Sequence, residues 1–319
     1  MILAMETKHQ PKLSIILPCL NEELSIEKCV ADIQNELESK IDYEILIVNN
    51  NSSDNSEYIA MELQRKNKKV RVTFEGQIGY GSACIRGFDE AQGEILLLMD
   101  IDQTYPVNKI LDFLDEIQKG NDFVIGNRFT GEIQKGSMPK LHQFIGNPLL
   151  SYLIRLFFKT PIRDSHCGMR AIKKESYEKL NFRTSGMEFA SEMVVKVLKE
   201  KMKTSEIAIS YHPRIGESKL KSFRDGWRHL RFMLLYSPLY LFLAPGVFCF
   251  SIGLVSMIAI YFAKLNLAGF QLIVHPIFVS SLLMITGYQL MLFAAFAKSY
   301  AVTHLQEKNE FIERLFKIF

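Results

Sequence analysis

The chain has 319 residues, with 38 Lys and Arg against 35 Asp and Glu, which gives a formal net charge of +3. So mild a charge gives no reason to expect a nucleic-acid partner, and the length suffices for one large domain or two ordinary ones. Apolar residues make up 48% of the chain but are unevenly spread, because 232–263 and 265–297 contain no Asp, Glu, Lys or Arg.

The first 130 residues alternate short apolar runs with segments of helical spacing. Continuous aliphatic runs between turn signals are typical of strands buried on both faces. Strands that alternate with helices favour a doubly wound, parallel sheet. The expected strands cover 13–18, 43–48, 70–74, 95–99 and 123–126, and the expected helices cover 24–37, 56–66, 82–91 and 107–119.

Two aspartates separated by one residue follow the strand expected at 95–99. Ligands bind at the carboxyl ends of strands in an open parallel sheet, and alternation along an extended chain points Asp100 and Asp102 the same way. Mg²⁺ and Mn²⁺ prefer such oxygen ligands and often share them with substrate phosphates. The pattern therefore predicts a metal–diphosphate site, against the alternative of a solvated acidic loop.

The pattern weakens after residue 130. The apolar segment 149–158 fits either a core helix or one that lies in a membrane interface, and we favour the interface. Residues 164–170 are expected to form a loop that enters a strand. A helix is expected at 186–198 and a further strand at 207–211.

The two charge-free stretches near the C-terminus are each long enough to span a bilayer as a helix. The preceding segment 212–231 is rich in Lys and Arg, which favour the cytoplasmic side of a membrane. Five scattered cysteines without a C-x-x-C pair also favour a reducing compartment. We therefore expect a cytoplasmic domain (1–225), followed by a juxtamembrane helix, two transmembrane helices and a cytoplasmic tail (226–319).

Seven short motifs, taken in order, resemble the family-two glycosyltransferases. They are PCLNEE (18–23), IVNNNSSD (47–54), IGYGSA (78–83), MDID (99–102), GNRF (126–129), DSHCGMR (164–170) and GMEFASEM (186–193). Within that family the chain is most similar to the polyprenyl-phosphate branch, the dolichyl-phosphate mannosyl- and glucosyltransferase type. The segments DGWRHLRF (225–232) and LLYSP (234–238) resemble its microbial dolichyl-phosphate-glucose-like members.

This resemblance implies an α/β fold of the GT-A type, with a doubly wound, mostly parallel sheet followed by two transmembrane helices. It also implies a UDP- or GDP-hexose donor, a divalent metal (Mg²⁺ or Mn²⁺) and a polyprenyl phosphate, dolichyl or undecaprenyl, as acceptor. The enzyme would be an integral protein of the cell membrane of a prokaryote. The oligomeric state is left open, with a homo-oligomer among the alternatives.

The resemblance assigns roles to particular residues. Asp100 and Asp102 would hold the metal, and Arg128 would bind the acceptor phosphate, with Lys140 and Arg170 as weaker candidates. Asp164 and Glu188 would hold sugar hydroxyls or orient the arginines. The residues expected to bind the donor, the last three of them in a late R-x-x-x-S-K element, are Pro18, Asn21, Glu22, Asn50, Asp54, Gly79, Arg214, Ser218 and Lys219.

Two departures from the family pattern bear on these roles. Many members have a pair of aspartates where this chain has Asn49 and Asn50, and an amide both donates and accepts hydrogen bonds where a carboxylate only accepts. Archaeal mannosyl members hold the metal with a Gln two residues after the second Asp, where this chain has Thr104, with Gln103 one position earlier.

The expected reaction is an inverting, metal-dependent hexose transfer to a lipid phosphate. Two alternatives remain. A processive family-two enzyme would carry further C-terminal motifs and more spans. A catalytically inactive membrane module that binds sugar nucleotides is compatible with the Asn-Asn pair, but the intact D-x-D argues against it.

Overall fold

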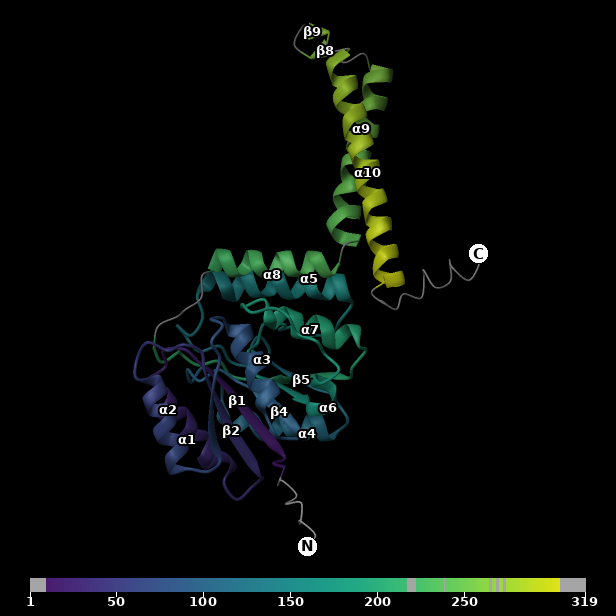
Figure 1. The fold of residues 1–319 in the computed structure, drawn as a ribbon. Helices are drawn as coiled ribbons and strands as arrows, with labels where there is room; N and C mark the ends of the chain where they lie inside the picture. Colours follow the sequence, from purple (N-terminus) through teal and green to yellow (C-terminus); the bar gives the residue numbers. More distant parts are fainter. Residues whose placement is uncertain are drawn as a thin grey trace. The chain divides into compact units, whose positions relative to one another are not determined.

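The computed structural model describes residues 10–216, 222–237, 239–263, 266–267, 270–271 and 274–304. Its contacts separate two units, Met1–Phe232 and Met233–Phe319 (Figure 1). The boundary between the units lies within helix α8 (Ser222–Tyr236), and the boundary expected at residues 225–226 falls in the same helix.

A seven-stranded sheet forms the centre of the first unit. Its neighbours are parallel except at β6, which pairs antiparallel with both β4 and β5. Because β6 is antiparallel to both of its neighbours, β4 and β5 run parallel to each other. The carboxyl ends of β1, β2, β4 and β5 therefore lie at the same edge of the sheet. The order across the sheet is β3 (Val70–Phe74), β2 (Tyr43–Asn49), β1 (Leu13–Cys19), β4 (Ile95–Leu98), β6 (Arg170–Lys173), β5 (Phe123–Asn127) and β7 (Thr204–Ala208).

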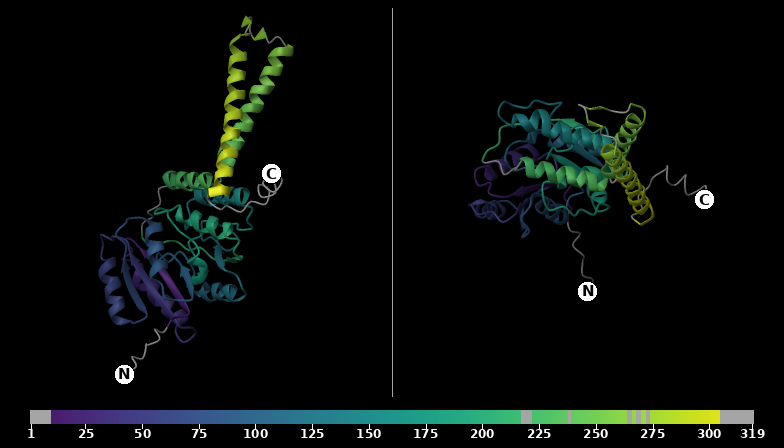
Figure 2. Two further views of the ribbon diagram at one scale, coloured as in Figure 1. Left: turned by 45° about the vertical axis from the view of Figure 1, so that its right-hand side comes forward. Right: turned by 90° about the horizontal axis from the view of Figure 1, so that it is seen from above.

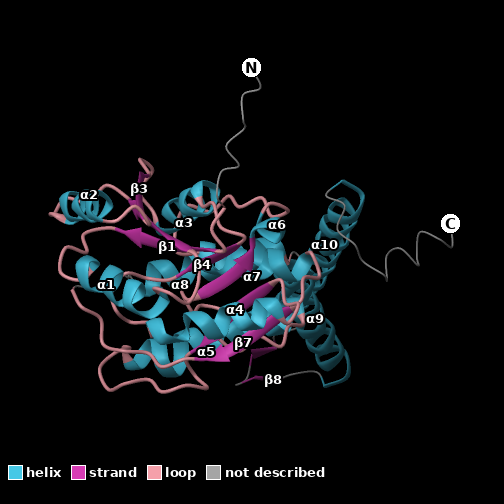
Figure 3. Ribbon diagram, turned by 90° about the horizontal axis from the view of Figure 1, so that it is seen from below, coloured by secondary structure: helices cyan, strands magenta, loops and turns pink. Residues whose placement is uncertain are grey.

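The strands form where continuous aliphatic runs can be buried on both faces. All seven residues of β2 are buried, and so are six of the seven in β1. Helices cover both faces of the sheet (Figure 3). They are α1 (Ile26–Leu37), α2 (Ser56–Lys66), α3 (Tyr80–Glu90), the 3₁₀ turn η1 (Val107–Lys109) with α4 (Ile110–Gln118), the short α6 (Lys174–Tyr177) and α7 (Phe189–Lys199).

Most boundaries differ from the expected ones by one or two residues, but two differences are larger. The strand expected at 207–211 is found at Thr204–Ala208, because the register with β5 places Thr204 opposite Phe123. The helix expected from residue 186 starts at Phe189. The mostly parallel, doubly wound sheet is confirmed.

Two helices with apolar or basic exposed faces lie on the side of α7 away from the sheet (Figures 1 and 2). The first is α5 (Asn147–Phe158), which continues from the short π-helical turn η2 (His142–Gly146). It buries Ser151 and Ile154 on one face. Large apolar side chains are exposed at helical spacing along this segment: Leu141 just before η2, Phe144 and Ile145 in η2, and Leu149, Tyr152 and Leu156 in α5.

The second of these helices is α8. Its buried face carries Asp225, His229 and Phe232. Its exposed face carries Trp227, which is 60% exposed, among Arg224, Arg228 and Arg231. Both helices are therefore amphipathic.

The second unit contains two long apolar helices, α9 (Ala244–Ala263) after the π-helical turn η3 (Leu239–Leu243), and α10 (Val274–His304). Between them, β8 (Asn266–Leu267) pairs with β9 (Phe270–Gln271). The segments Tyr240–Phe262 and Pro276–Ser299 have mean hydropathies of 2.2 and 1.8 and are long enough to cross a membrane. Ser256 and Ser280 join the two helices by a hydroxyl–hydroxyl hydrogen bond of 2.8 Å.

Candidate active site

The carboxyl edge of the sheet brings together three groups of polar side chains. The turns after β1 and β2 carry Asn21, Glu22, Asn50 and Asp54, β4 leads into the D-x-D pair, and Arg128 follows β5. The strand order places the D-x-D pair between the first group and Arg128.

The two aspartates of the D-x-D sequence are bound by different partners. The Tyr80 hydroxyl, at the start of α3, donates to Asp100 Oδ1 at 3.1 Å. Asp102 Oδ1 accepts hydrogen bonds from Thr104, at 3.1 Å from the backbone N–H and 2.6 Å from the hydroxyl. Arg214 Nη1 lies 3.2 Å from Asp102 Oδ2.

Arg214 also connects this pair to the first turn. Its Nη2 donates to Glu22 Oε1, so one guanidinium bridges the carboxylates of Glu22 and Asp102. The backbone N–H of Ile215 donates to the carbonyl of Asp102 at 3.0 Å, which fixes the segment after β7 against the D-x-D loop. The structure therefore brings together three of the residues expected to act on the donor or metal. Ser218 and Lys219 lie outside the described residues.

The carboxylates repel one another within the fold. Burial, and then the charge of Asp102, raise the pKa of Asp100 to about 7. A cation held between the two aspartates would relieve this repulsion. Among the described residues, however, no cluster of three or more His, Cys, Asp or Glu side chains has the arrangement of a metal site.

The donor set nevertheless fits Mg²⁺ or Mn²⁺, because such ions commonly use one or two carboxylates and take their remaining ligands from phosphates and water. Neither Thr104, at the family's glutamine position, nor Gln103, one position earlier, extends the set. The Thr104 hydroxyl donates to Asp102. The side-chain amide of Gln103 is oriented so that both of its ends form hydrogen bonds. Its nitrogen donates to Asp32 and its oxygen accepts from the backbone N–H of Cys29, both in α1.

Asn50 binds the segment that leads into α3. Its Nδ2 donates to the carbonyls of Glu75 at 2.9 Å and Gln77 at 2.8 Å, and its Oδ1 accepts from the backbone N–H of Gly79 at 2.8 Å. An aspartate could accept from Gly79 but would oppose the two carbonyls. The amide at position 50 thus has a local structural reason in this chain.

The other residues expected on the donor side lie in the same turns. Asn21, with a left-handed φ of +52°, accepts from the backbone N–H of Ser53 at 2.7 Å. Asp54 accepts from the backbone N–H groups of Glu23 and Ser56. Pro18 is the sixth residue of β1.

Gly79 immediately precedes α3 and has a φ of +154°. A Cβ at this position would lie 2.1 Å from the carbonyl oxygen of Ser185, so only glycine fits. Gly79 therefore allows the loop before α7 to pack closely against the start of α3.

Arg128 is held by Asp164 in a buried, two-pronged ion pair. Its Nε donates to Asp164 Oδ2 at 2.7 Å, its Nη2 donates to Oδ1 at 2.8 Å, and its backbone N–H donates to Oδ2 at 3.0 Å. Asp164 is fully buried and Arg128 is 5% exposed. Because Asp164 occupies the Nε–Nη2 edge, a phosphate can meet this guanidinium only through Nη1 and the second Nη2 hydrogen.

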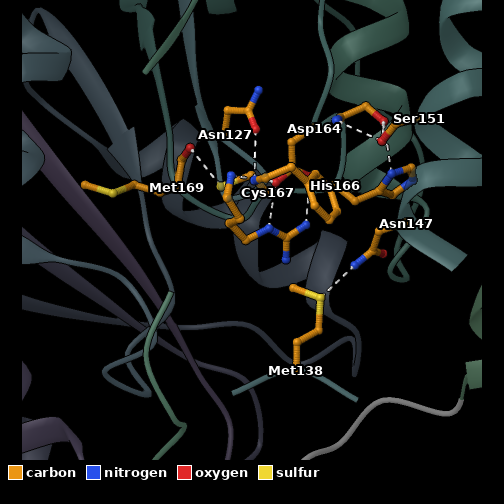
Figure 4. A network of polar contacts seen from close by, with 12 residues as sticks. Asn127, Met138, Asn147, Ser151, Asp164, His166, Cys167 and Met169 are labelled. Atoms are coloured by element: carbon orange, nitrogen blue, oxygen red, sulfur yellow. Dashed lines mark hydrogen bonds and ion pairs between the residues drawn. The ribbon is translucent and has the colours of Figure 1, made fainter. Parts of the chain in front are cut away.

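The loop around Asp164 is fixed by its neighbours (Figure 4). Glu206 of β7 accepts from the backbone N–H groups of Arg163 and Asp164. Arg170 is 1% exposed and donates to the carbonyls of Ser165, Cys167 and Ala190 at 3.0, 2.7 and 2.7 Å. Arg170 therefore stabilises this loop by binding its backbone carbonyls. Because it is buried and its donors are occupied, it is not a candidate for binding the acceptor phosphate, contrary to the expectation from the sequence.

Glu188 stands directly before α7. Its Oε2 is buried without a hydrogen-bond partner among the described residues. A Cβ on Gly186 would lie 2.4 Å from this oxygen and 3.0 Å from Nη1 of Arg228, so both groups flank Gly186. Glu188 thus lies near Arg228 of α8, whereas Asp164 is hydrogen-bonded to Arg128.

Sequence reasoning missed several residues of this region. Tyr80 binds Asp100 from 20 residues away, and His166, Ser191 and His229 form a buried chain behind Asp164. An apolar pattern carries no signal for such contacts. The signal available in the sequence was membership of a motif, because Tyr80 lies in IGYGSA, His166 in DSHCGMR, Ser191 in GMEFASEM and His229 in DGWRHLRF.

Comparison with known proteins identifies the family. The glycosyl transferase family 2 profile matches residues 14–181. The chain belongs to this family. The match spans β1 to β6 and ends shortly after α6, so it includes the D-x-D pair and the Arg128–Asp164 pair.

Several relatives are hexosyltransferases. The low-salt glycan biosynthesis hexosyltransferase Agl6 of Haloferax volcanii is 36% identical over 93% of this chain and 71% of its own. A dolichol-phosphate mannosyltransferase of Pyrococcus furiosus is 32% identical over 66% of this chain and 59% of its own. A dolichyl-phosphate hexose transferase of H. volcanii is 28% identical over 67% and 89%. This glycosyltransferase is thus related to dolichyl-phosphate hexose transferases.

Solved structures share the fold. Glucosyl-3-phosphoglycerate synthase from Mycobacterium tuberculosis, in complex with Mn²⁺, UDP and glucosyl-3-phosphoglycerate, superposes with a TM-score of 0.57 at 18% identity. The match covers 72% of this chain and 80% of that one. It supports the GT-A type fold that the sequence predicts.

We expect Asn50→Asp to loosen the 75–79 segment and to weaken binding of UDP or GDP by about tenfold or more, because a carboxylate would face two carbonyl oxygens. Hydrogen–deuterium exchange of peptides covering 75–79, together with calorimetry of the nucleotide, measures both effects. The matched control is Asn35→Asp, the same change at an exposed position of α1. Unchanged exchange and affinity in Asn50→Asp would contradict the role given to its amide.

Proposed function

We propose that this glycosyltransferase moves a hexose from a UDP- or GDP-sugar to a polyprenyl phosphate, with inversion at the anomeric carbon. The relatives named for dolichyl-phosphate transfer support the acceptor class. The observation that carries the proposal is the order of groups along the carboxyl edge of the sheet. Nucleotide-side turns come first, then the D-x-D pair, then the Arg128–Asp164 pair.

The D-x-D carboxylates are suited to a divalent cation that shares the donor diphosphate. Asp100 and Asp102 supply oxygen ligands, and a bound Mg²⁺ or Mn²⁺ would neutralise charge on the leaving nucleoside diphosphate. Arg214 is a basic residue on the same side, in contact with Asp102. Its guanidinium can turn from the two carboxylates towards the diphosphate, as the late R-x-x-x-S-K element implies.

Arg128 is our candidate for binding the acceptor phosphate. A fixed guanidinium gives directional, charged hydrogen bonds to a phosphate oxygen. Asp164 fixes the side chain and leaves its outer N–H groups pointing away from the ion pair. Asp164 thus orients the arginine, one of the two roles expected for it.

The chemistry needs little more than positioning. The second pKa of a phosphate monoester is about 6, so the acceptor oxygen is an anionic nucleophile near neutral pH without a general base. Its attack on the anomeric carbon forms the new C–O bond while the bond to the diphosphate breaks, and the electron pair leaves on the diphosphate oxygen. Direct displacement turns an α-linked donor into a β-linked lipid phosphate.

The exposed helices are suited to a membrane surface. The segment from Leu141 through η2 and α5 presents six large apolar side chains, and α8 presents Trp227 among three arginines. An apolar helix face next to Trp and Arg is typical of an element that lies in the interfacial region of an anionic membrane. This supports our preference for an interfacial position of 149–158 and would bring the lipid phosphate to the domain.

We expect Asp102→Asn to reduce transfer more than about 100-fold while leaving the fold intact, because it removes a ligand charge and keeps the shape. The measurement is transfer of labelled hexose to polyprenyl phosphate in detergent or vesicles, with Mg²⁺ or Mn²⁺ and with chelator. Asp112→Asn, on the exposed side of α4, is the matched control. Near-wild-type turnover of Asp102→Asn would refute the metal assignment. Failure of the wild-type protein to label the lipid with any UDP- or GDP-hexose would refute the function.

We also expect the protein to remain in membranes after carbonate extraction, with both ends and the catalytic domain on the cytoplasmic side, because basic residues flank the two candidate spans. Cysteines introduced at positions 266 and 319 can be labelled with a membrane-impermeant reagent on intact cells. Labelling at 266 and protection at 319 is the expected result. The reverse pattern would overturn this topology.

A further inference from the structure

A largely buried chain of hydroxyls and imidazoles runs behind the Arg128–Asp164 pair. Ser151 Oγ of α5 lies 3.0 Å from Ser165 Oγ and accepts from the Ser165 backbone N–H at 3.3 Å. His166 Nδ1 lies 3.0 Å from Ser165 Oγ, and its Nε2 lies 3.0 Å from Ser191 Oγ of α7. Ser191 Oγ lies 2.8 Å from His229 Nδ1 of α8.

This serine–histidine chain (Ser151, Ser165, His166, Ser191, His229) connects three helices to one loop. Two of its members, Ser165 and His166, directly follow Asp164 in the sequence. Its two ends, Ser151 and His229, lie on the buried faces of the helices α5 and α8, whose opposite faces carry the exposed apolar and basic side chains. The serine–histidine chain therefore joins α5 and α8 to the loop of Asp164, the residue that holds Arg128.

The hydrogen-bonding capacity of the chain is met when both imidazoles are neutral. Each neutral ring donates through one nitrogen and accepts through the other, and a serine hydroxyl donates one hydrogen and accepts others. Ser191 can then accept from one ring and donate to the other. If both rings were protonated, two N–H groups would face Ser191 and its own hydrogen would lose its acceptor.

The surroundings keep the rings neutral. Burial lowers the pKa of His229 to about 4, with Arg170 acting in the same direction and Asp225 opposing it. Burial, His229, Arg170 and Arg128 lower the pKa of His166 well below its usual range. The two rings also meet edge to face, with centroids 4.6 Å apart. At neutral pH the chain is therefore a fixed, uncharged connection.

We propose that the serine–histidine chain is a positioning device that sets the Arg128–Asp164 pair at a fixed depth relative to α5 and α8. The inference rests on the proposed transfer to a lipid phosphate. An acceptor phosphate held at the membrane surface meets Arg128 only if the arginine lies at the matching height. Ser191 is the central positioning residue, because its hydroxyl lies within hydrogen-bond distance of a nitrogen of each ring.

The test is Ser191→Ala, which removes that hydroxyl from a fully buried site. We expect KM for the lipid phosphate to rise about 5- to 30-fold, the range that one or two hydrogen bonds cover, with kcat within about twofold. The donor dissociation constant, measured by calorimetry, should not change. Ser191→Thr keeps the hydroxyl and should recover most of the lipid KM.

The matched control is Ser176→Ala, which removes a hydroxyl from another buried position, in α6, outside the chain. If Ser191→Ala does not fold, Ser151→Ala tests the chain from its other end with the same expected rise in KM. An unchanged lipid KM in Ser191→Ala, or an equal rise in Ser176→Ala, overturns the inference alone. Absence of transfer by the wild-type protein overturns both the proposed function and this inference.

Discussion

The buried ion pair between Arg128 and Asp164 is the constraint around which the acceptor side is built. Both charges are almost fully removed from water, so losing either partner would leave the other unpaired at a cost of about 3–5 kcal/mol. The pair survives because Asp164 accepts three N–H groups from Arg128 and because Glu206 and Arg170 fix the loop around it. Helices α5, α7 and α8 are joined to that loop by hydrogen bonds. The positions of α5 and α8, the two helices with exposed apolar and basic faces, are therefore coupled to the position of the loop.

The donor side of the same sheet edge follows a different principle. Its loops are fixed partly by uncharged amides, above all by Asn50, which satisfies Glu75, Gln77 and Gly79 together, and partly by Asp54, which accepts from two backbone N–H groups. Charge is concentrated instead at the D-x-D pair, where Arg214 bridges Glu22 and Asp102. A cation bound there would take the place of Arg214 beside Asp102, and Arg214 would be free to bind the diphosphate. Binding would therefore rearrange charges that are already present.

Much of this arrangement can be predicted from the sequence, and the exceptions have physical causes. The strands at 13–19 and 43–49 each contain a continuous aliphatic run, at 15–17 and 45–48, so hydrophobicity alone identifies them. The edge strand β7 is half polar, and its place is set by pairing with β5, which periodicity does not reveal. The antiparallel strand β6 is likewise placed by its pairing with β4 and β5, which periodicity does not reveal. Contacts such as Tyr80–Asp100 and Ser191–His229 join residues 20 to 38 positions apart, and no local pattern encodes them.

The most direct test of the account is Arg128→Lys, which keeps a positive charge opposite Asp164 but lacks the planar fork. Donor affinity would be measured by calorimetry, and the transfer rate as a function of polyprenyl-phosphate concentration. Because one or two charged hydrogen bonds to the acceptor are lost, the account predicts that transfer at low lipid phosphate falls about 10- to 100-fold, with donor affinity unchanged. Lost donor affinity with an unchanged dependence on the lipid phosphate would contradict it and place Arg128 on the donor side.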